Sequence, residues 1–226
     1  MSAAVSVERE YLPATEAASV ELVLLHGWGC NRDIWRALLP ALRPWANITL
    51  LDLAGLAPGL GAAPVALDEL LANVANAAPP SAVYLGWSLG GQLAMALAAR
   101  RPEQVSAVIT LCSSPRFTAT TDWPGMPATS LAQFSRALAD NPTTALRRFD
   151  SLQIAGAEDG RHLMRVVQGL RRGRSDGPLE TGLQWLAQLD QRASWRELKQ
   201  PQLHLLGERD QLLAADLGCA LAELMK

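Results

Sequence analysis

One short segment limits the possible folds of this chain more than any other. The run GWSLGG at 86–91 directly follows an apolar strand pattern, Val83–Leu85, and opens a pattern of small residues typical of a helix, Gly90–Arg100. A G-x-S-x-G in this setting places its serine on a sharp strand-to-helix turn with unfavourable backbone angles, and small neighbours let the chain pass closely on both sides. The helix N-terminus and the Leu89 N–H then favour negative charge on an attacked carbonyl oxygen. We therefore predict that Ser88 is a nucleophile; the alternative is a chance match to the pattern.

Short apolar runs alternate with helical patterns along much of the chain. The spacing of Ile34, Leu38 and Leu42 within 33–42 is typical of a helix. Strands that alternate with helices favour a parallel sheet with helices on both faces, joined by right-handed crossovers, so the expected fold class is α/β. The other predicted strands are Val20–Leu25, Ile48–Leu53, Val105–Leu111 and Gln202–Leu206.

The alternation stops between residues 113 and 196. This stretch holds several helical patterns and no run typical of a strand, with Pro115, Pro124 and Pro127 near its start. We interpret 113–196 as a helical cap inserted between two strands of a core formed by 1–112 and 197–226. The 226 residues, 49% of them hydrophobic, suffice for one large core, and nothing in the length requires two independent domains.

Two further segments follow predicted strands and suit the chemistry of a serine nucleophile. The run HGWG at 26–29 would supply a second oxyanion donor through the backbone N–H of Trp28. The run GERD at 207–210 lies where a triad carboxylate belongs in the chain order Ser, acid, His, so Asp210 is the predicted acid that orients a histidine. Asp52 precedes the nucleophile and is interpreted as a loop-fixing residue.

The histidine that such a triad needs is not evident. The three histidines are His26, His162 and His204, and none follows Asp210. His26 more often orders its loop than acts as a base, His204 lies inside the strand that delivers Asp210, and His162 has arginine neighbours typical of a surface helix. We expect none of the three to serve as the base, because nucleophile, base and orienting acid must meet at hydrogen-bond distance.

Composition argues against several classes of partner. The net charge of −2 and the pI near 5.9 give no overall reason to expect nucleic acid or a membrane surface. The N-terminus lacks a signal-peptide pattern and no apolar run approaches about 20 residues, so we expect a cytoplasmic protein. Cys30, Cys112 and Cys219 form no C-x-x-C pair and are expected to be reduced, buried thiols. No metal or organic cofactor is implied, and the proposed chemistry needs none.

The predicted cap has a local excess of positive charge, which leaves two readings open. One is a solvated helix face. The other is docking of an acidic, phosphate-bearing partner, because guanidinium groups match phosphate and carboxylate well. Between 136 and 174 four acids stand against eight arginines, at 136, 147, 148, 161, 165, 171, 172 and 174.

Several longer segments resemble one family, the pimeloyl-[acyl-carrier protein] methyl ester esterases of biotin synthesis, within the α/β-hydrolases. The segments are LVLLHGWGCNRDIW, YLGWSLGGQLA, RPEQVSAVITLCSSPRF with the following DWPG, RRFDSLQ and LLGERDQLL. The resemblance runs from about residue 20 to the end of the chain. It implies a mostly parallel sheet flanked by helices with an inserted four-helix cap, and hydrolysis of the methyl ester of pimeloyl-carrier protein.

The resemblance also implies roles for individual residues. Ser88 would be the nucleophile, Asp210 the triad acid, and Trp28 and Leu89 the oxyanion residues. Arg148, Arg161 and Arg165 would meet the acyl-carrier protein, which favours the docking reading of the cap. The cap segment beside the acyl chain would comprise Phe149, Asp150, Ser151, Leu152 and Gln153.

One departure from the family pattern bears on activity. The sequence ends at Met225-Lys226, whereas the resemblance implies a further strand, a histidine-bearing loop and a final helix. We therefore expect a truncated member with impaired turnover, an exposed edge strand around Leu205, and self-association in place of the monomer expected of a complete chain. Two alternatives remain: a non-catalytic homologue that binds carrier protein, and a generic short-chain carboxylesterase.

Overall fold

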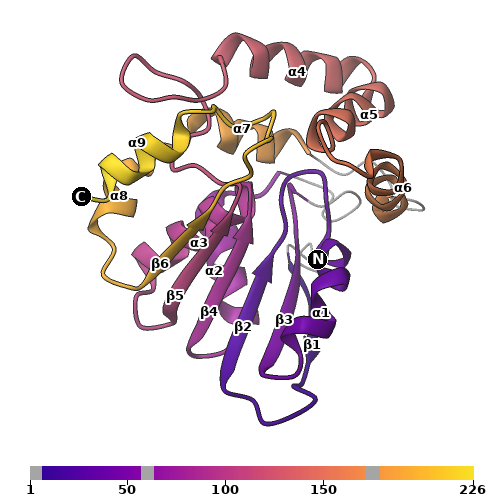
Figure 1. Cartoon of the computed structure of the whole chain (residues 1–226). Coiled ribbons are helices and arrows are strands. Elements are labelled where there is room, and N and C mark those ends of the chain that lie inside the picture. The colour runs from indigo at the N-terminus through magenta and orange to yellow at the C-terminus, as the bar shows by residue number, and fades with distance from the viewer. Residues whose placement is uncertain (1–6, 57–63, 172–178) are drawn as a thin grey trace.

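The computed structural model describes residues 7–56, 64–171 and 179–226, and a six-stranded sheet forms its centre (Figure 1). The order across the sheet is β1-β3-β2-β4-β5-β6. Strand β1 is antiparallel to β3, and all other neighbours are parallel, which confirms the predicted α/β class. The strands are β1 (Val7–Leu12), β2 (Val20–Leu25), β3 (Ala46–Leu53), β4 (Ala82–Trp87), β5 (Val105–Leu111) and β6 (Gln202–Leu205).

The helices form two groups around this sheet. One group of helices lies within the segment predicted as the cap, and Figure 1 shows α4, α5 and α7 beyond the carboxyl ends of the parallel strands. They are α4 (Ala128–Asp140), α5 (Pro142–Gln153), α6 (Gly160–Arg171) and α7 (Glu180–Gln188). The remaining helices are η1 (Arg32–Leu38), α1 (Leu39–Leu42), α2 (Leu67–Ala77), α3 (Leu89–Arg100), α8 (Arg192–Glu197) and α9 (Leu217–Leu224). No helix in the described ranges is long and apolar enough to cross a membrane.

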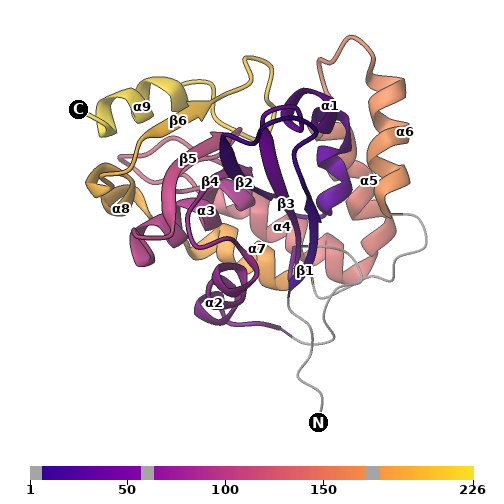
Figure 2. The same ribbon diagram turned by 90° about the horizontal axis from the view of Figure 1, so that it is seen from below.

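Alternate residues of each strand supply the two faces of the core. Val23 and Leu25 pack in one cluster with side chains of α2 and α3, whereas Leu22 and Leu24 pack in a second cluster with Trp35 of η1. This period of two follows from the pleat of a strand. Figure 2 shows the same separation, with α2 and α3 on one side of the sheet and α1 on the other. The central strands are therefore covered on both faces, as their continuous apolar sequences predict.

Three details differ from the sequence-based expectations. The segment expected as one helix over 33–42 divides into η1 and α1, because Pro40 in the first turn of α1 has no N–H to continue the ladder. Strand β1, helix α2 and helix α9 were not predicted. The cysteine prediction holds only for buried Cys30, since Cys112 is half-buried and Cys219 exposed.

Strand β6 lies at the edge of the sheet and its leucines are exposed, as expected from the sequence. A row of paired residues crosses from β2 to β6 through Leu24, Leu85, Ile109 and Leu203. Leu24 is fully buried, Leu85 is 7% exposed, and Leu203 is 50% exposed. Packing on this face therefore weakens steadily toward β6.

Candidate active site

Ser88 occupies the predicted strained turn between β4 and α3. Its backbone angles, φ 54° and ψ −122°, lie where L-amino acids rarely occur. Its N–H donates to the Leu111 carbonyl at 2.8 Å, and its carbonyl accepts from the Gly91 N–H at 2.9 Å and the Ser113 hydroxyl at 2.7 Å. Strain of this kind persists only where the surroundings over-determine it, as these bonds do.

The small residues around Ser88 are needed because backbone segments touch there. A Cβ on Gly86 would lie 2.3 Å from the Gly90 carbonyl oxygen, and one on Gly90 would lie 2.4 Å from the Leu25 carbonyl oxygen. Both distances are well inside van der Waals contact. The turn therefore requires glycine at both positions, for close approach and not for unusual backbone angles.

The loop after β2 lies against this turn. A Cβ on Gly27 would lie 3.3 Å from the Ser88 Cβ, so the two segments are in contact. Among the hydrogen bonds of the described residues, none uses the backbone N–H of Trp28. Leu89 is the first residue of α3, where a backbone N–H has no partner in the preceding turn. The residues that precede the two predicted donors, Gly27 and Ser88, are therefore in contact.

Two polar residues hold that loop in place. His26 is fully buried; its Nε2 accepts from the Leu53 N–H at 3.1 Å, so its Nδ1 carries the proton and donates to the Gly27 carbonyl at 2.8 Å. Asp52, also fully buried, accepts from the Arg32 N–H at 2.5 Å. The loop-ordering interpretations of His26 and Asp52 are therefore confirmed.

The other two histidines lie away from Ser88. His204 in β6 stacks on Trp195 of α8 with ring centroids 4.8 Å apart, and its Nδ1 is 2.8 Å from the Thr110 hydroxyl. Burial lowers its pKa. His162 is exposed on α6. In the part of the chain that the structure describes, no histidine ring bonds to the side chain of Ser88 or Asp210.

Asp210 lies in the loop after β6 and lines the same cavity as Ser88, about 660 Å³ in volume. One carboxylate oxygen accepts from the N–H groups of Leu212 and Leu213, at 2.8 and 3.1 Å. Cys112 also lines this cavity; burial raises the pKa of its thiol, and the negative charge of Asp210 raises it further. The predicted nucleophile and the predicted acid therefore share one cavity, with Cys112 beside the acid.

A second, more apolar cavity of about 230 Å³ lies between α4, α5 and α7. Phe149 and Leu152 line it, and the exposed Arg148 lies on its wall. Phe117 and Leu212 line both cavities. These two side chains therefore form a shared wall between the space around Ser88 and the interior of the cap.

Comparison with known proteins identifies the family of the chain. Residues 21–224 match the family model of the alpha/beta hydrolase fold. The pimeloyl-[acyl-carrier protein] methyl ester esterase of Methylococcus capsulatus is 39% identical over 217 residues, which covers 93% of this chain and 84% of that protein. The enzyme of the same name from Klebsiella pneumoniae is 39% identical over 196 residues, covering 85% of this chain and 76% of that protein. The chain belongs to the pimeloyl-[acyl-carrier protein] methyl ester esterase family of α/β-hydrolases.

Solved structures show the same fold at low sequence identity. An esterase from Exiguobacterium antarcticum superposes with a TM-score of 0.82 at 19% identity, covering 97% of this chain and 83% of that chain. An enol-lactonase from Burkholderia xenovorans gives a TM-score of 0.81 at 16% identity, covering 96% and 84%. By family, this α/β-hydrolase is a serine carboxylesterase.

The cap residues implied for this esterase family fall into two sets. Phe149 meets Trp28 edge-on with centroids 5.0 Å apart, Leu152 lines the apolar cavity, and Gln153 lines the cavity at Ser88. By contrast, Asp150 is buried within the cap, and the exposed Ser151 donates to the carbonyl of Arg147 on its own helix. Three of the five residues therefore face the cavities.

The arginines implied to meet the carrier protein lie on two cap helices. Arg148 is exposed on α5, and Arg161 and Arg165 are exposed on α6, whose Val167 is buried. Arg172 and Arg174, counted in the predicted excess of positive charge, lie outside the described residues. The described part of the cap thus presents separate cationic side chains on its surface.

Sequence reasoning missed residues that meet only through the fold. Phe117 and Leu212 are far apart in the sequence, and neither carries a catalytic pattern. Cys112 has φ 44°, a second strained residue beside the cavity, and nothing in its sequence context marks it. Among the described residues, no group of three or more His, Cys, Asp or Glu side chains is placed to hold a metal ion.

Proposed function

We propose that this chain carries the catalytic scaffold for hydrolysis of the methyl ester of pimeloyl-carrier protein in biotin synthesis. The observation that supports this substrate best is the pair of adjoining cavities. The strained turn presents Ser88 to one cavity, and beyond Phe117 and Leu212 an apolar cavity leads to Arg148 on the cap surface. A linear acyl chain joined to a carrier protein would place its ester at Ser88 and its carrier outside.

The proposed reaction has two steps. The Ser88 hydroxyl attacks the ester carbonyl, the backbone N–H groups of Trp28 and Leu89 stabilise the oxyanion, and methanol leaves as the acyl-enzyme forms. Water then attacks the carbonyl of the acyl-enzyme, its proton passes through the base to the Ser88 oxygen, and the free acid leaves. Both steps need a base to take the proton from the attacking oxygen, and Asp210 would orient it.

We infer that none of the three histidines is this base. His26 and His204 use their rings elsewhere, and His162 is exposed on the cap. When one triad member is missing, the oxyanion hole and binding alone still give about 10³- to 10⁴-fold catalysis over water. Residues 1–226 alone should therefore hydrolyse the ester slowly, and an imidazole placed between Ser88 and Asp210 should restore the rate.

The carrier protein would dock on the cap. Arg148, Arg161 and Arg165 are exposed, and guanidinium groups bind the phosphate and carboxylate groups of an acidic partner. Replacing Arg161 and Arg165 together by Gln should raise KM for the carrier-bound ester and leave hydrolysis of free methyl esters unchanged. An equal loss on both substrates would contradict docking at these residues.

The direct test is hydrolysis of synthetic methyl-pimeloyl-carrier protein by two proteins. One is the 226-residue chain, and the other is the same chain fused to the histidine-bearing segment of a family member. We expect slow release of acid by the first, rapid release by the second, and none when Ser88→Ala is introduced into the fusion. A folded fusion that stays inactive would contradict the roles of Ser88 and Asp210.

One observation favours a second function, binding of the carrier protein without hydrolysis. The cap arginines and both cavities are present, while the histidine rings bond elsewhere. Titration of the chain with methyl-pimeloyl-carrier protein separates the two functions. Saturable binding with no acylation of Ser88 and no rescue by the fusion would support the binding role.

A further inference from the structure

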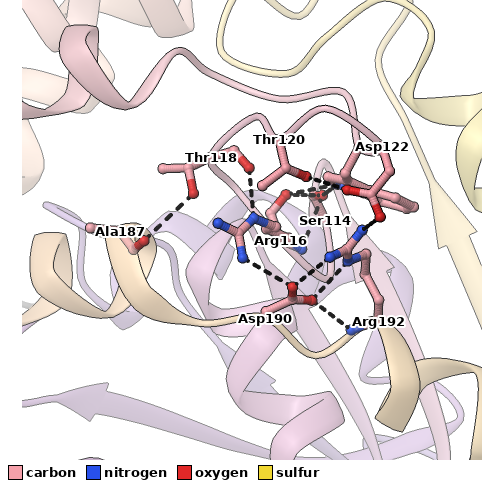
Figure 3. Close-up of polar contacts among 9 residues, drawn as sticks. Ser114, Arg116, Thr118, Thr120, Asp122, Ala187, Asp190 and Arg192 are labelled. Atoms are coloured by element: carbon pink, nitrogen blue, oxygen red, sulfur yellow. Dashed lines mark hydrogen bonds and ion pairs between the residues drawn. The ribbon is translucent and has the colours of Figure 1, made fainter.

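The two chain connections of the cap are tied together by a cluster of charged side chains (Figure 3). Arg116 follows β5 and donates to Asp190, which follows α7, at 3.0 Å. Arg192 donates to both oxygens of Asp190, at 2.7 and 2.9 Å, and to Asp122 at 2.9 Å. We name Arg116, Asp122, Asp190 and Arg192 the cap clamp. It joins the segment that leaves the core to the segment that returns to it.

The clamp is electrostatically strong for a cluster near the surface. Hydrogen bonds from Arg192 lower the pKa of Asp190 to about 2, and the same hydrogen bonds to Asp190 raise the pKa of Arg192. The Arg192 guanidinium also lies over the Trp123 ring, 5.7 Å from its centroid. Charge-assisted, bidentate contacts of this kind fix orientation as well as position.

Backbone contacts connect the clamp to the nucleophile helix. The Gln191 N–H donates to the Pro115 carbonyl at 2.9 Å, which joins the two connections independently of the clamp. Gln92 lies one turn after Ser88 in α3, and its side chain donates to the Ser114 carbonyl at 2.6 Å. The segment that carries Arg116 is therefore fixed relative to Ser88.

Phe117 is enclosed by these contacts. Arg116, before it, bonds to Asp190 and also donates through Nε to the Thr118 carbonyl at 3.1 Å. Thr118, after it, donates to the Ala187 carbonyl at 3.5 Å (Figure 3). The residues on both sides of Phe117 are thus held against the end of α7. The Phe117 side chain, 8% exposed, forms one part of the wall between the two cavities.

We propose that Phe117 is a specificity-determining residue that admits linear acyl chains to the apolar cavity and rejects branched ones, and that Arg116 and Asp190 are positioning residues for it. The inference rests on the proposed esterase function. Leu212, the other residue that lines both cavities, is held by the bond from its N–H to Asp210. An acyl group reaching from Ser88 into the cap has to cross the boundary that these two residues form. A chain branched near the carbonyl would clash there with Phe117.

The test compares binding of methyl octanoate and methyl 2-propylpentanoate, two neutral esters of the same composition. All proteins carry Ser88→Ala, so that binding is measured by tryptophan fluorescence without hydrolysis. We expect the parent to bind the linear ester more tightly than the branched one. Phe117→Ala should reduce the ratio of the two affinities about tenfold, and Arg116→Gln or Asp190→Asn should reduce it about threefold. Asp68→Asn, which removes the exposed ion pair of Asp68 with Arg100, is the matched control and should leave the preference unchanged.

The preference ratio distinguishes positioning from a general structural role. If Arg116→Gln and Asp190→Asn lower the melting temperature but leave the ratio unchanged, the clamp does not position Phe117. An unchanged ratio in Phe117→Ala, or a parent that binds neither ester, overturns the proposal itself. If the fusion enzyme hydrolyses methyl-pimeloyl-carrier protein but Phe117→Ala leaves the preference ratio unchanged, only this inference is rejected. If the fusion is inactive but Phe117→Ala alters the preference ratio, only the proposed function is rejected.

Discussion

The two halves of the candidate active site rest on different strands of one sheet, one half on the central strands and the other on an edge strand, and these strands are packed differently. The nucleophile half stands on β2 and β4, where Leu24 is fully buried and the turn at Ser88 is fixed by backbone contacts on every side. The acid half stands on β6, whose Leu203 is 50% exposed. Asp210 is held chiefly by bonds within its own loop. The position of Ser88 is therefore determined by the core, and the position of Asp210 by its own loop.

Glycine substitutions should separate the two halves most strongly. Gly86→Ala places a Cβ 2.3 Å from the Gly90 carbonyl oxygen and should destabilise the protein by about 3 kcal/mol. Gly207→Ala, in the acid loop, meets Cys112 Sγ at 3.6 Å, an ordinary contact, and should change stability by less than about 0.5 kcal/mol. Urea unfolding measures both. Equal losses would show that the acid loop is as tightly packed as the turn.

The exposed end of the sheet should also control self-association. We expect copies of the chain to associate through β6, because an exposed edge with apolar side chains invites pairing. Leu203→Lys combined with Leu205→Lys removes about 1.5 kcal/mol of apolar contact per leucine, about tenfold each in dissociation constant. Sedimentation velocity measures the effect, and Leu38→Lys, at an exposed leucine of η1, is the control. Association that persists in the double variant would place the contact elsewhere.

The cap clamp contributes a pH-dependent term to the stability of the fold. The pKa of Asp190 falls from 3.8 to about 2 in the folded protein, so its carboxylate stabilises the fold above pH 3.8. That contribution is lost as the pH falls toward 2. At neutral pH we expect the free energy of unfolding of the parent to exceed that of Asp190→Asn by about 1 kcal/mol, after solvent screening is allowed for. This difference should shrink below pH 4. A difference that grows on acidification would contradict the assigned ion pair.

The smallest predicted effect concerns the thiol beside the acid. Burial and the Asp210 charge both raise the pKa of Cys112, so Asp210→Asn should lower that pKa and speed alkylation of Cys112 by iodoacetamide at pH 8 a few-fold. Cys219, exposed on α9, is the internal control and should react at the same rate in both proteins. Peptide mass spectrometry follows the two sites separately. Unchanged reactivity of Cys112 would show that Asp210 does not lie beside it.

The features that the sequence predicts correctly are those that depend on residues adjacent in the chain. The strands Val20–Leu25 and Val105–Leu111 agree with the structure at both ends, because a short, mostly apolar and β-branched run is itself the signal for a buried strand. The turn at Ser88 was equally predictable, since its glycines and flanking elements are adjacent in the chain. Strand β1 was missed because the charges in VEREYL suit an edge strand and conceal its alternation.

The cavities required the folded structure. Phe117 and Leu212 share a wall only because the cap returns over the sheet, and Arg116 meets Asp190 across 74 positions of sequence. Residue type alone also gave a wrong prediction of burial. Cys219 was expected to be buried, as most free cysteines are, but it is exposed. Residue type predicts an average environment, whereas these contacts depend on the particular path of the chain.

The most direct test of the central claim is the rate at which a fluorophosphonate labels Ser88 in residues 1–226, with and without added imidazole, followed by intact mass. The account predicts slow labelling that imidazole accelerates and that Ser88→Ala abolishes, because the nucleophile is in place and its base is not among the three histidines. Labelling that persists in Ser88→Ala, or that is fast and independent of imidazole, would contradict it.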